Sequence, residues 1–364
     1  MEFTNVKLFS AQSADLCEAI KAYANECVNE RKGVKAFSEH SKEEMGKLVN
    51  KAFAQELVKQ SGFALEDGMD KTAIKRYSLN PQVKYFANEI RDVMVDAIMP
   101  IVLSNSSLRF VTDIKYADLG DTIKFDLESD GLFTVSKAGN RKRHYPIQKT
   151  FRTSVTLTGD NHEIAVGTTL YEVLTNQSYI AEDVMRMAYS MEYAMLSDGY
   201  DAFISAVGTI PSELTTVGFN EKAIVKICEK VSAYNGGRKA VIMGTPTALK
   251  NVLPSNANYR YLLDSEYVKL GHLQQFNGFD VLPMENVADP FGATDYAMKF
   301  DDTKLYIVSP ASDKLIKLGV FGGTITHTDA PYDNANKSID TVTEKAWNTI
   351  FATGSIMGSV TGLS

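Results

Sequence analysis

Residues 176–207 read NQSYIAEDVMRMAYSMEYAMLSDGYDAFISAV, and this stretch decides the fold. Its apolar residues recur at a spacing near 3.6, which predicts one amphipathic helix. They are Ile180, Val184, Met187, Ala188, Met191, Met195, Ala202, Phe203 and Val207. At 1.5 Å per residue the helix measures roughly 40–45 Å, a length that favours a supporting strut over a core filler. The candidate N-caps are Thr175, Asn176 and Ser178, and Gly199 is where a bend would arise.

The composition is that of a folded protein. Of the 364 residues, 44% are hydrophobic and 23% are charged, and the formal net charge is −7. The negative balance argues against a dedicated nucleic-acid binder. The three cysteines form no CxxC motif, which fits a reducing compartment. The opening MEFTNVKLFSAQSADL has no apolar core of a signal peptide, and no run approaches the ~18 apolar residues of a membrane span. We therefore expect a soluble protein that folds in cytoplasm.

Three amphipathic helices are predicted within residues 1–103. The apolar face of the first covers residues 16–28, and Gly33 is placed to end it. The sequence from Ser41 to Glu44 is a capping box for the second helix, which Gly62 ends. Asn80-Pro81 opens the third helix, and we expect it to stop at Pro100.

The apolar period changes from 3.6 to 2 after residue 107. Alternation over 110–115, 123–127 and 147–158 predicts strands, and Asp130-Gly131 is a turn signal. Between the last two strands lies the cationic segment KAGNRKRH, residues 137–144. The pattern predicts a long β-arm with a cationic tip, which leads into the long helix.

The remainder of the chain changes to an α/β pattern. Asn220 opens a helix that closes at residues 235–237, and Thr245-Pro246 opens another that ends by residue 254. Short strands are predicted at 239–244, 279–285 and 304–308, and everything beyond residue 314 reads as β-structure.

Recognised catalytic motifs are missing from the sequence. It contains no GxSxG, GxxxxGK or GxGxxG, and its five histidines never fall at helical ligand spacing. Asp301-Asp302 is better explained as a solvated loop than as an acid/base pair, and Cys228 as a small core residue. The residues give no positive reason to expect an enzyme, a cofactor or a metal.

The order of these parts resembles the major capsid proteins of tailed bacteriophages, which have the Hong Kong 97-type shell fold that is also found in encapsulins. The resemblance covers roughly residue 80 to the C-terminus, whereas residues 1–80 match no part of the family pattern. The segments that carry it are FVTDIKYADLGDTIKF (110–125), the arm (130–160), the long helix (176–207), RKAVIMGTPTALKNVL (238–253), GFDVLPME (278–285) and LYIVSPASDKLIKLGV (305–320).

The resemblance implies an α+β fold of five parts. These are a helical N-terminal segment (1–105), the β-arm or E-loop with strands of the P-domain (106–175), the spine helix of the P-domain (176–219), the A-domain (220–315) and a β return to the P-domain (316–364), whose last strand would rejoin the A-domain. We expect residues 1–80 to be a structural part of the shell protein, with their apolar helix faces buried.

The function implied is that of a non-enzymatic virion protein without cofactors. It would assemble in the host cytoplasm into hexamers and pentamers of an icosahedral shell that encloses double-stranded DNA. Its partners would be other copies of itself, a portal protein and scaffold or decoration proteins, with no membrane. Two alternatives stay open: an encapsulin-type compartment shell, and a cytosolic α/β enzyme with an unrecognised site.

Opposite charges on the arm and the long helix suggest contacts between neighbouring subunits. The arm carries six cations and no acid between residues 131 and 159: Lys137, Arg141, Lys142, Arg143, Lys149 and Arg152. The helix carries one cation, Arg186, against the acids Glu182, Asp183, Glu192, Asp198 and Asp201. In an isolated chain both would be ordinary solvated faces. In a shell of this type the arm crosses an adjacent subunit, and we hypothesise that its cations pair with acids on or beside the neighbour's helix.

Certain relatives join an arm lysine covalently to an asparagine of a neighbour, with a glutamate as base. Lys137, Lys142 and Lys149 could supply the amine, and Asn334, Asn336 and Glu344 lie in the C-terminal β region. These residue types are abundant in any protein, so we do not expect the cross-link here.

Overall fold

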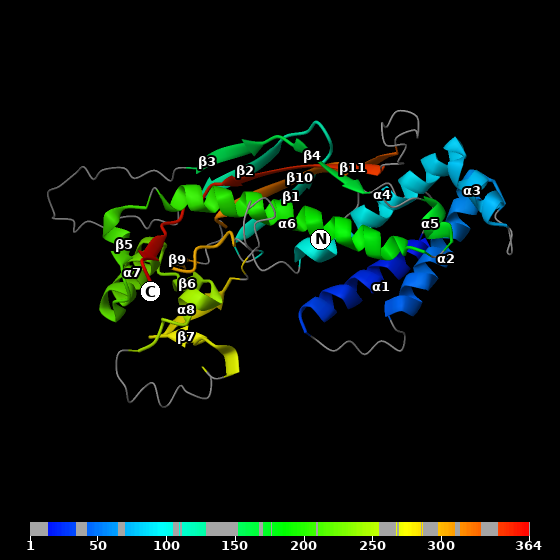
Figure 1. Ribbon diagram of the computed structural model, residues 1–364. Coiled ribbons are helices and arrows are strands. Elements are labelled where there is room, and N and C mark those ends of the chain that lie inside the picture. Colours follow the sequence, from blue (N-terminus) through cyan, green and yellow to red (C-terminus); the bar gives the residue numbers. More distant parts are fainter. Residues whose placement is uncertain are drawn as a thin grey trace.

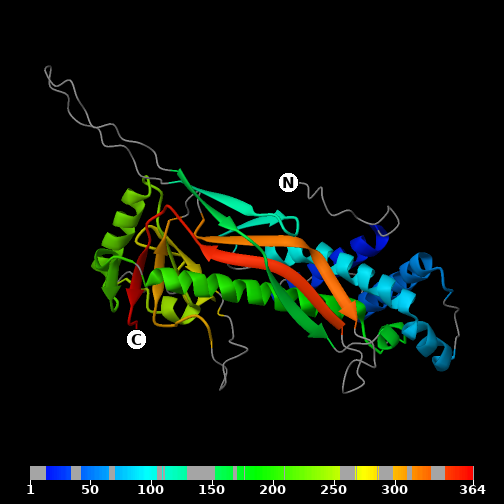
Figure 2. The same ribbon diagram turned by 90° about the horizontal axis from the view of Figure 1, so that it is seen from above.

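The computed structural model describes residues 14–33, 42–64, 70–104, 109, 111–128, 152–166, 170–175, 177–208, 210–254, 267, 269–284, 286, 298–309, 314–328 and 341–363. The long helix α6 (Ile180–Val207) has 28 residues and runs through the middle of the molecule. At one end of α6 lie the N-terminal helices, at the other end lies a lobe built on a six-stranded sheet, and a four-stranded sheet runs along its side (Figures 1 and 2). Helices pack against sheets whose strand pairs are mostly antiparallel, so the predicted α+β class is confirmed.

The start of α6 differs from the prediction. Its N-cap is Tyr179, which makes no side-chain cap bond. The cap comes instead from Asn50 on α2 (Lys42–Ser61), whose Oδ1 accepts from the N–H of Ile180 at 2.9 Å. The Asn50 amide donates to the Ser178 carbonyl at 2.9 Å, so one buried side chain fixes the entry of the chain into the helix. The Thr175 hydroxyl, a candidate cap, donates back to the Tyr171 carbonyl at 2.8 Å.

Five helices gather at the N-terminal half of α6. They are α1 (Ala14–Arg31), α2, α3 (Lys71–Leu79), α4 (Pro81–Ser104) and α5 (Leu170–Leu174). Three of them, α1, α2 and α4, pack against α6 directly. The apolar faces of the helices form one core with α6, in which Ile20 and Phe53 are almost completely buried. In the described part of residues 1–80 the apolar faces are covered as predicted, except at Leu48 of α2, which was expected to face inward and is 54% exposed.

Helix α4 begins as predicted and ends later. Asn80 accepts from the N–H of Gln82 through Oδ1, and Pro81 is the first helical residue. The predicted stop at Pro100 is wrong, because the helix continues to Ser104. Proline interrupts one backbone bond, but Val102 and Leu103 are each 2% exposed, so the core holds the last turn in place.

The four-stranded sheet has the order β1-β10-β11-β4. Its strands are β1 (Thr112–Ala117), β10 (Ile316–Thr328), β11 (Thr341–Phe351) and β4 (Asp160–Val166), and only the β1–β10 pair is parallel. Helices α4 and α6 pack against one face. At Gly199, where a bend seemed feasible, α6 is continuous, and a Cβ there would lie 3.5 Å from the Ile316 side chain.

The base of the arm is an antiparallel pair, β2 (Ile123–Glu128) and β3 (Arg152–Leu157). The pair is anchored by Phe125 and Leu157, which pack with Phe321 and Ala346 of the four-stranded sheet. The predicted cationic tip lies outside the described residues.

The lobe at the far end of α6 holds a six-stranded sheet of order β5-β12-β9-β6-β8-β7. The strands are β5 (Thr215–Val217), β12 (Gly358–Thr361), β9 (Leu305–Val308), β6 (Val241–Gly244), β8 (Phe279–Pro283) and β7 (Gln275–Phe276). Helices α7 (Glu221–Tyr234) and α8 (Pro246–Leu249) are capped by Asn220 and Thr245. The chain thus returns from the four-stranded sheet to place β12 between β5 and β9.

Candidate assembly surfaces

The acids predicted to face a neighbour occupy very different environments. Glu182 lies on the surface, and its carboxylate accepts from the Arg186 guanidinium one turn later at 2.6 Å. Asp183 is 8% exposed, accepts from the Ser178 hydroxyl at 3.2 Å, and interacts electrostatically with the buried Arg91 of α4. Of these two, Glu182 is therefore the one that a neighbouring chain can reach.

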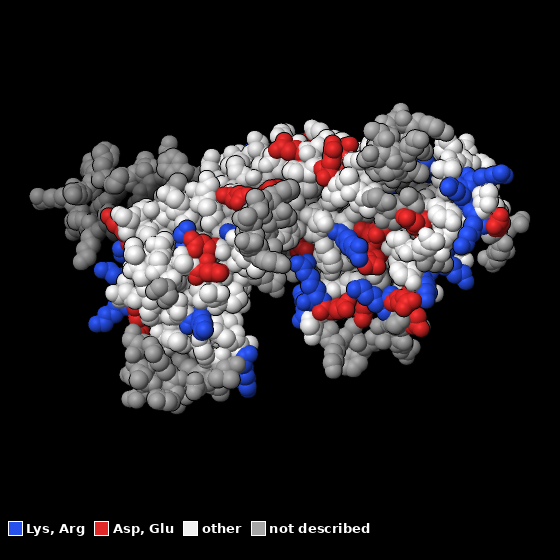
Figure 3. Space-filling model, viewed as in Figure 1, with Lys and Arg blue, Asp and Glu red and all other residues white. Residues whose placement is uncertain are grey.

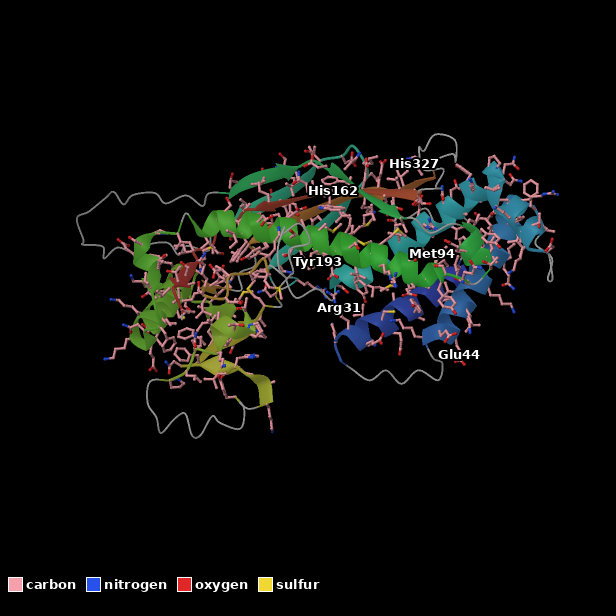
Figure 4. The ribbon with its side chains drawn as sticks, viewed as in Figure 1. Arg31, Glu44, Met94, His162, Tyr193 and His327 are labelled. Atoms are coloured by element: carbon pink, nitrogen blue, oxygen red, sulfur yellow. The ribbon has the colours of Figure 1, made fainter. Side chains whose placement is uncertain are left out.

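Glu192 is also occupied within its own chain. Its side chain is 5% exposed and forms an ion pair with Arg31, the last residue of α1, at 3.1 Å. The Arg31 guanidinium also lies over the ring of Tyr189, 4.9 Å from its centroid. This arrangement fastens the end of α1 to α6, and Figure 4 shows Arg31 on the side of α6 that faces away from the four-stranded sheet.

The predicted cations cannot be placed in the same way. Lys137, Arg141, Lys142, Arg143 and Lys149 lie outside the described residues, and Arg152 is described only as the first residue of β3. Asn334 and Asn336, the candidates for covalent joining, also lie outside them, whereas Glu344 is opposite Glu163 in the β11–β4 register. The pairing of arm and helix stays a prediction.

A polar joint that the sequence did not predict connects α4 and β10. Strand β10 extends beyond β1, whose last partner is Phe321, and its register with β11 shifts between Phe321 and Ile325. Beyond that point the Asp96 carboxylate accepts from the N–H and hydroxyl of Thr324, at 3.0 Å and 2.6 Å. A backbone irregularity of this kind leaves donors without a strand partner, and the helix supplies the acceptors.

Asp92 and Lys345 complete the polar joint. Asp92 lies one turn before Asp96 and accepts from the N–H and hydroxyl of Thr326. The Lys345 ammonium, 5% exposed, donates to Asp96 at 2.8 Å and to the Gly322 carbonyl at 2.9 Å. Burial raises the pKa of Asp92 to about 6, and the nearby Asp96 charge adds to the rise. The signal in the sequence was the pair of polar strand residues in Thr324-Ile-Thr326, matched by Asp92 and Asp96 at helical spacing.

A second polar cluster joins the edge strand β4 to α6. The rings of His162 and Trp347 stack with centroids 3.7 Å apart and planes 6° apart. The indole N–H of Trp347 donates to Asp198 at 2.9 Å, and the His162 ring nitrogen lies 3.8 Å from the same carboxylate. Asp198, predicted as an inter-subunit acid of the helix, is thus engaged with its own sheet.

The described residues give little support for metal binding, for crossing a membrane or for a reactive cysteine. No three residues among His, Cys, Asp and Glu there are placed to hold a metal ion, and no helix there is long and apolar enough to cross a membrane. Cys228 is completely buried, as predicted for a core residue, and burial raises the pKa of its thiol to about 12. A small gap lined by Phe203, Met243 and Ile316 is apolar.

The surface offers features that suit association between copies. The outer strands of the two large sheets are β1 and β4 in one, and β5 and β7 in the other. Val217 on β5 is 79% exposed, and Tyr116 on β1 is 43% exposed. Figure 3 shows that the molecule is hollowed between α1 and the six-stranded lobe, on the side away from the four-stranded sheet. Unpaired strands with exposed apolar side chains are typical of surfaces that other chains cover.

Comparison with known proteins gives matches in structure alone. No protein-family model matches the sequence, and no curated protein matches it. The structure is similar to the mature capsid of bacteriophage PhiM1, at 12% identity over 71% of this chain and 87% of that chain, with a TM-score of 0.46. It is also similar to the capsid of a native GTA particle, at 13% identity over 71% and 90%, with a TM-score of 0.45.

A third similar structure is the virus-like particle from Pyrococcus furiosus, at 7% identity over 72% of this chain and 95% of that chain, with a TM-score of 0.40. The first two structures are capsids, the class that the order of parts in the sequence resembles. Because all three TM-scores lie below 0.5 and the identities below 25%, the functional argument rests on the geometry of the chain itself.

Proposed function

We propose that this protein is the major capsid protein of a tailed bacteriophage, which self-assembles through hexamers and pentamers into an icosahedral shell around double-stranded DNA. The observation that carries the proposal is the pair β2 and β3, whose described strands end side by side at Glu128 and Arg152 and whose base is anchored on the four-stranded sheet by Phe125. A strand pair anchored in this way, with a cationic segment of sequence between its strands, suits a subunit that overlaps its neighbours. The exposed apolar residues on outer strands support the same reading.

In this proposal each part of the chain has a structural role. Helix α6 is the spine of the P-domain, residues 106–175 form the arm and P-domain strands, and residues 220–315 form the A-domain. Residues 1–105 are a helical segment attached to the spine, and 316–364 are the return. The division agrees with the separate cores around α6 and around the six-stranded sheet.

The finer parts of the proposal concern where the protein is located and which other molecules it contacts. The protein would be made in the host cytoplasm and end in the virion, and its shell would meet a portal protein and scaffold or decoration proteins. It would enclose DNA without reading its sequence and would have no catalytic role. An encapsulin-type shell is the alternative within the same fold, and a cytosolic enzyme is the alternative outside it.

The direct test is assembly of the purified full chain, followed by electron microscopy and sedimentation. Closed particles of uniform size are the expected result. A stable monomer or small oligomer across a range of protein and salt concentrations would leave the enzyme as the better reading. Particles isolated from the native source that hold a protein cargo and no DNA would favour the encapsulin-type shell.

The contact between arm and neighbour is part of the same proposal, with Glu182 as its reachable acid. Arg141→Glu with Arg143→Glu should lower the particle yield, and Glu182→Lys should restore part of it. Exposed pairs contribute only ~0–1 kcal/mol each, so the effect depends on many repeats and should weaken as salt rises toward 1 M. Normal yield from the arm variant at low salt would show that apolar contacts hold the arm.

A further inference from the structure

Four cations gather at the end of the N-terminal helices without an acidic partner among the residues that the structure describes. Lys71, Lys75 and Arg76 are exposed on α3, and Lys84 is half-buried in the first turns of α4. None of the four forms an ion pair with any residue that the structure describes. Asp70 is the only acid between residues 70 and 84, so this segment of the sequence carries 4 − 1 = +3 in a chain of net charge −7.

Helix α3 carries three of these cations on its solvent-exposed half. Lys71 and Lys75 are one turn apart, about 6 Å along the axis, and Arg76 is exposed about 100° further round the helix from Lys75. The other half of the helix is held by Tyr77, whose hydroxyl donates to the Phe63 carbonyl at 3.4 Å, and the buried Ser78 lies at the boundary next to Lys71. Figure 3 shows blue over the end of the molecule where Figure 1 places α3. The cations are therefore held on a supported helix.

We propose that this corner, made by α3 and the start of α4, binds the sugar-phosphate backbone of nucleic acid without regard to sequence. The proposal deepens the function proposed above, because the ligand there is the enclosed double-stranded DNA. Unpaired Lys and Arg gain affinity from phosphates by releasing condensed counterions. Because the whole chain is negatively charged, its affinity for DNA should be low. The contact with DNA should therefore be confined to this corner.

An acidic protein surface is the competing ligand. Protein interfaces have an apolar centre surrounded by polar residues. The large apolar side chains exposed at this corner are Leu79 at the end of α3 (42%) and Tyr85 in the first turns of α4 (60%), and two separate residues are fewer than the apolar centre of a protein interface needs. A ligand that is anionic along its length fits this composition better than one that needs an apolar centre.

The experiment measures binding of a fluorescent DNA duplex to the purified unassembled chain by anisotropy, over a series of salt concentrations. With three to four phosphate contacts, the logarithm of the association constant should fall with the logarithm of salt concentration with a slope of about −3 to −4. Lys71→Glu with Lys75→Glu should reduce affinity by about ten-fold and make the slope shallower by about two.

The matched control is Lys222→Glu with Lys226→Glu on α7. This pair has the same spacing, is also exposed and changes the net charge equally, so it separates a local site from general repulsion. The control variant should bind DNA nearly as well as the unaltered chain. Lys71→Ala with Lys75→Ala, which preserves helix propensity, should also weaken binding and serves if the Glu variant fails to fold.

Three results would overturn the proposal: equal losses from both pairs, unchanged affinity in the α3 variants, or poly-L-glutamate binding this corner more tightly than DNA does. The last result would identify an acidic protein as the ligand. The assay uses single subunits, so it gives its answer whether or not particles form. A failure of assembly would therefore count against the shell function and not against this site.

Discussion

The four-stranded sheet meets α4 through carboxylates, hydroxyls and an ammonium group, whereas the six-stranded sheet meets α7 through aliphatic side chains. In the first, Asp96 accepts from both Thr324 and Lys345. In the second, Ile227 and Val231 pack against the strands around Ile307. The difference follows the backbone. Strand β10 has a register shift and extends beyond its neighbour β1, so its free backbone N–H groups need acceptors from outside the sheet. The strands beneath α7 pair regularly and need no such acceptors from the helix.

Removing the cation of the polar joint should have the largest effect on stability. Lys345→Met leaves the Asp96 carboxylate without its ammonium partner in a mostly buried place, and we expect a loss of about 3–5 kcal/mol in the free energy of unfolding. Urea unfolding of the unassembled chain at pH 7 measures it. Adding Asp96→Asn removes the uncompensated charge and keeps an acceptor for Thr324, so the double variant should recover more than half. A loss below about 1 kcal/mol in the single variant would mean that the joint is not stabilising.

Truncating a side chain in the core of the six-stranded sheet should lower the free energy of unfolding somewhat less, and this loss should not depend on pH. Leu305 is completely buried, and Leu305→Ala should lower the free energy of unfolding by about 3 kcal/mol through lost burial and the cavity it leaves. Because no charge is involved, the loss should be equal at pH 5 and pH 8. Leu270→Ala, at a residue 45% exposed, is the control and should change stability by less than about 0.5 kcal/mol. A pH-dependent loss would contradict the distinction between the two sheets.

Asp92→Asn tests the joint through pH. The pKa of Asp92 is raised to about 6 in the folded chain from 3.8, so the native state binds its proton more tightly. The stability due to this group is fully present below pH 3.8 and is lost as pH rises to about 6. Asn keeps the acceptor for Thr326 without the charge. The variant should match the unaltered chain near pH 4 and be more stable by about 2 kcal/mol at pH 7.

Urea titrations of both chains between pH 4 and pH 7 give this difference directly, and contributions from other groups cancel in it. Equal stability at both ends of the range would mean that Asp92 does not titrate in the joint.

The smallest expected effect is a gain from Gly199→Ala. The added Cβ would meet Ile316 and Thr349 at ordinary contact distances of 3.5–3.6 Å, and the position is helical. Reduced freedom of the unfolded chain should then stabilise the protein by about 0.4–1 kcal/mol, seen as a higher urea midpoint. A loss would mean that α6 needs glycine there for a closer approach to the sheet.

Much of the fold could be predicted because the sequence signals are local. The apolar period marks α6, and Asn80-Pro81, Asn220 and Thr245-Pro246 mark helix starts that the structure has. The errors came from contacts distant in sequence. Asn50 caps a helix 130 residues away, and core packing carries α4 past Pro100. The acids of α6 show the same limit, because charge alone cannot tell exposed Glu182 from buried Glu192.

The position of β12 has a consequence for how the chain is made. Strand β5 pairs with no other strand in the described sheet, and its partner β12 lies 144 residues later, as from Thr215 to Ser359. Residues 358–361 leave the ribosome after every other strand in the described chain, so the sheet cannot close during most of translation. Pairing across such separations is slow, and until it occurs β5 and β9 keep open edges. Synthesis thus imposes an order of events in which the six-stranded lobe closes only after α6 and the four-stranded sheet have been translated.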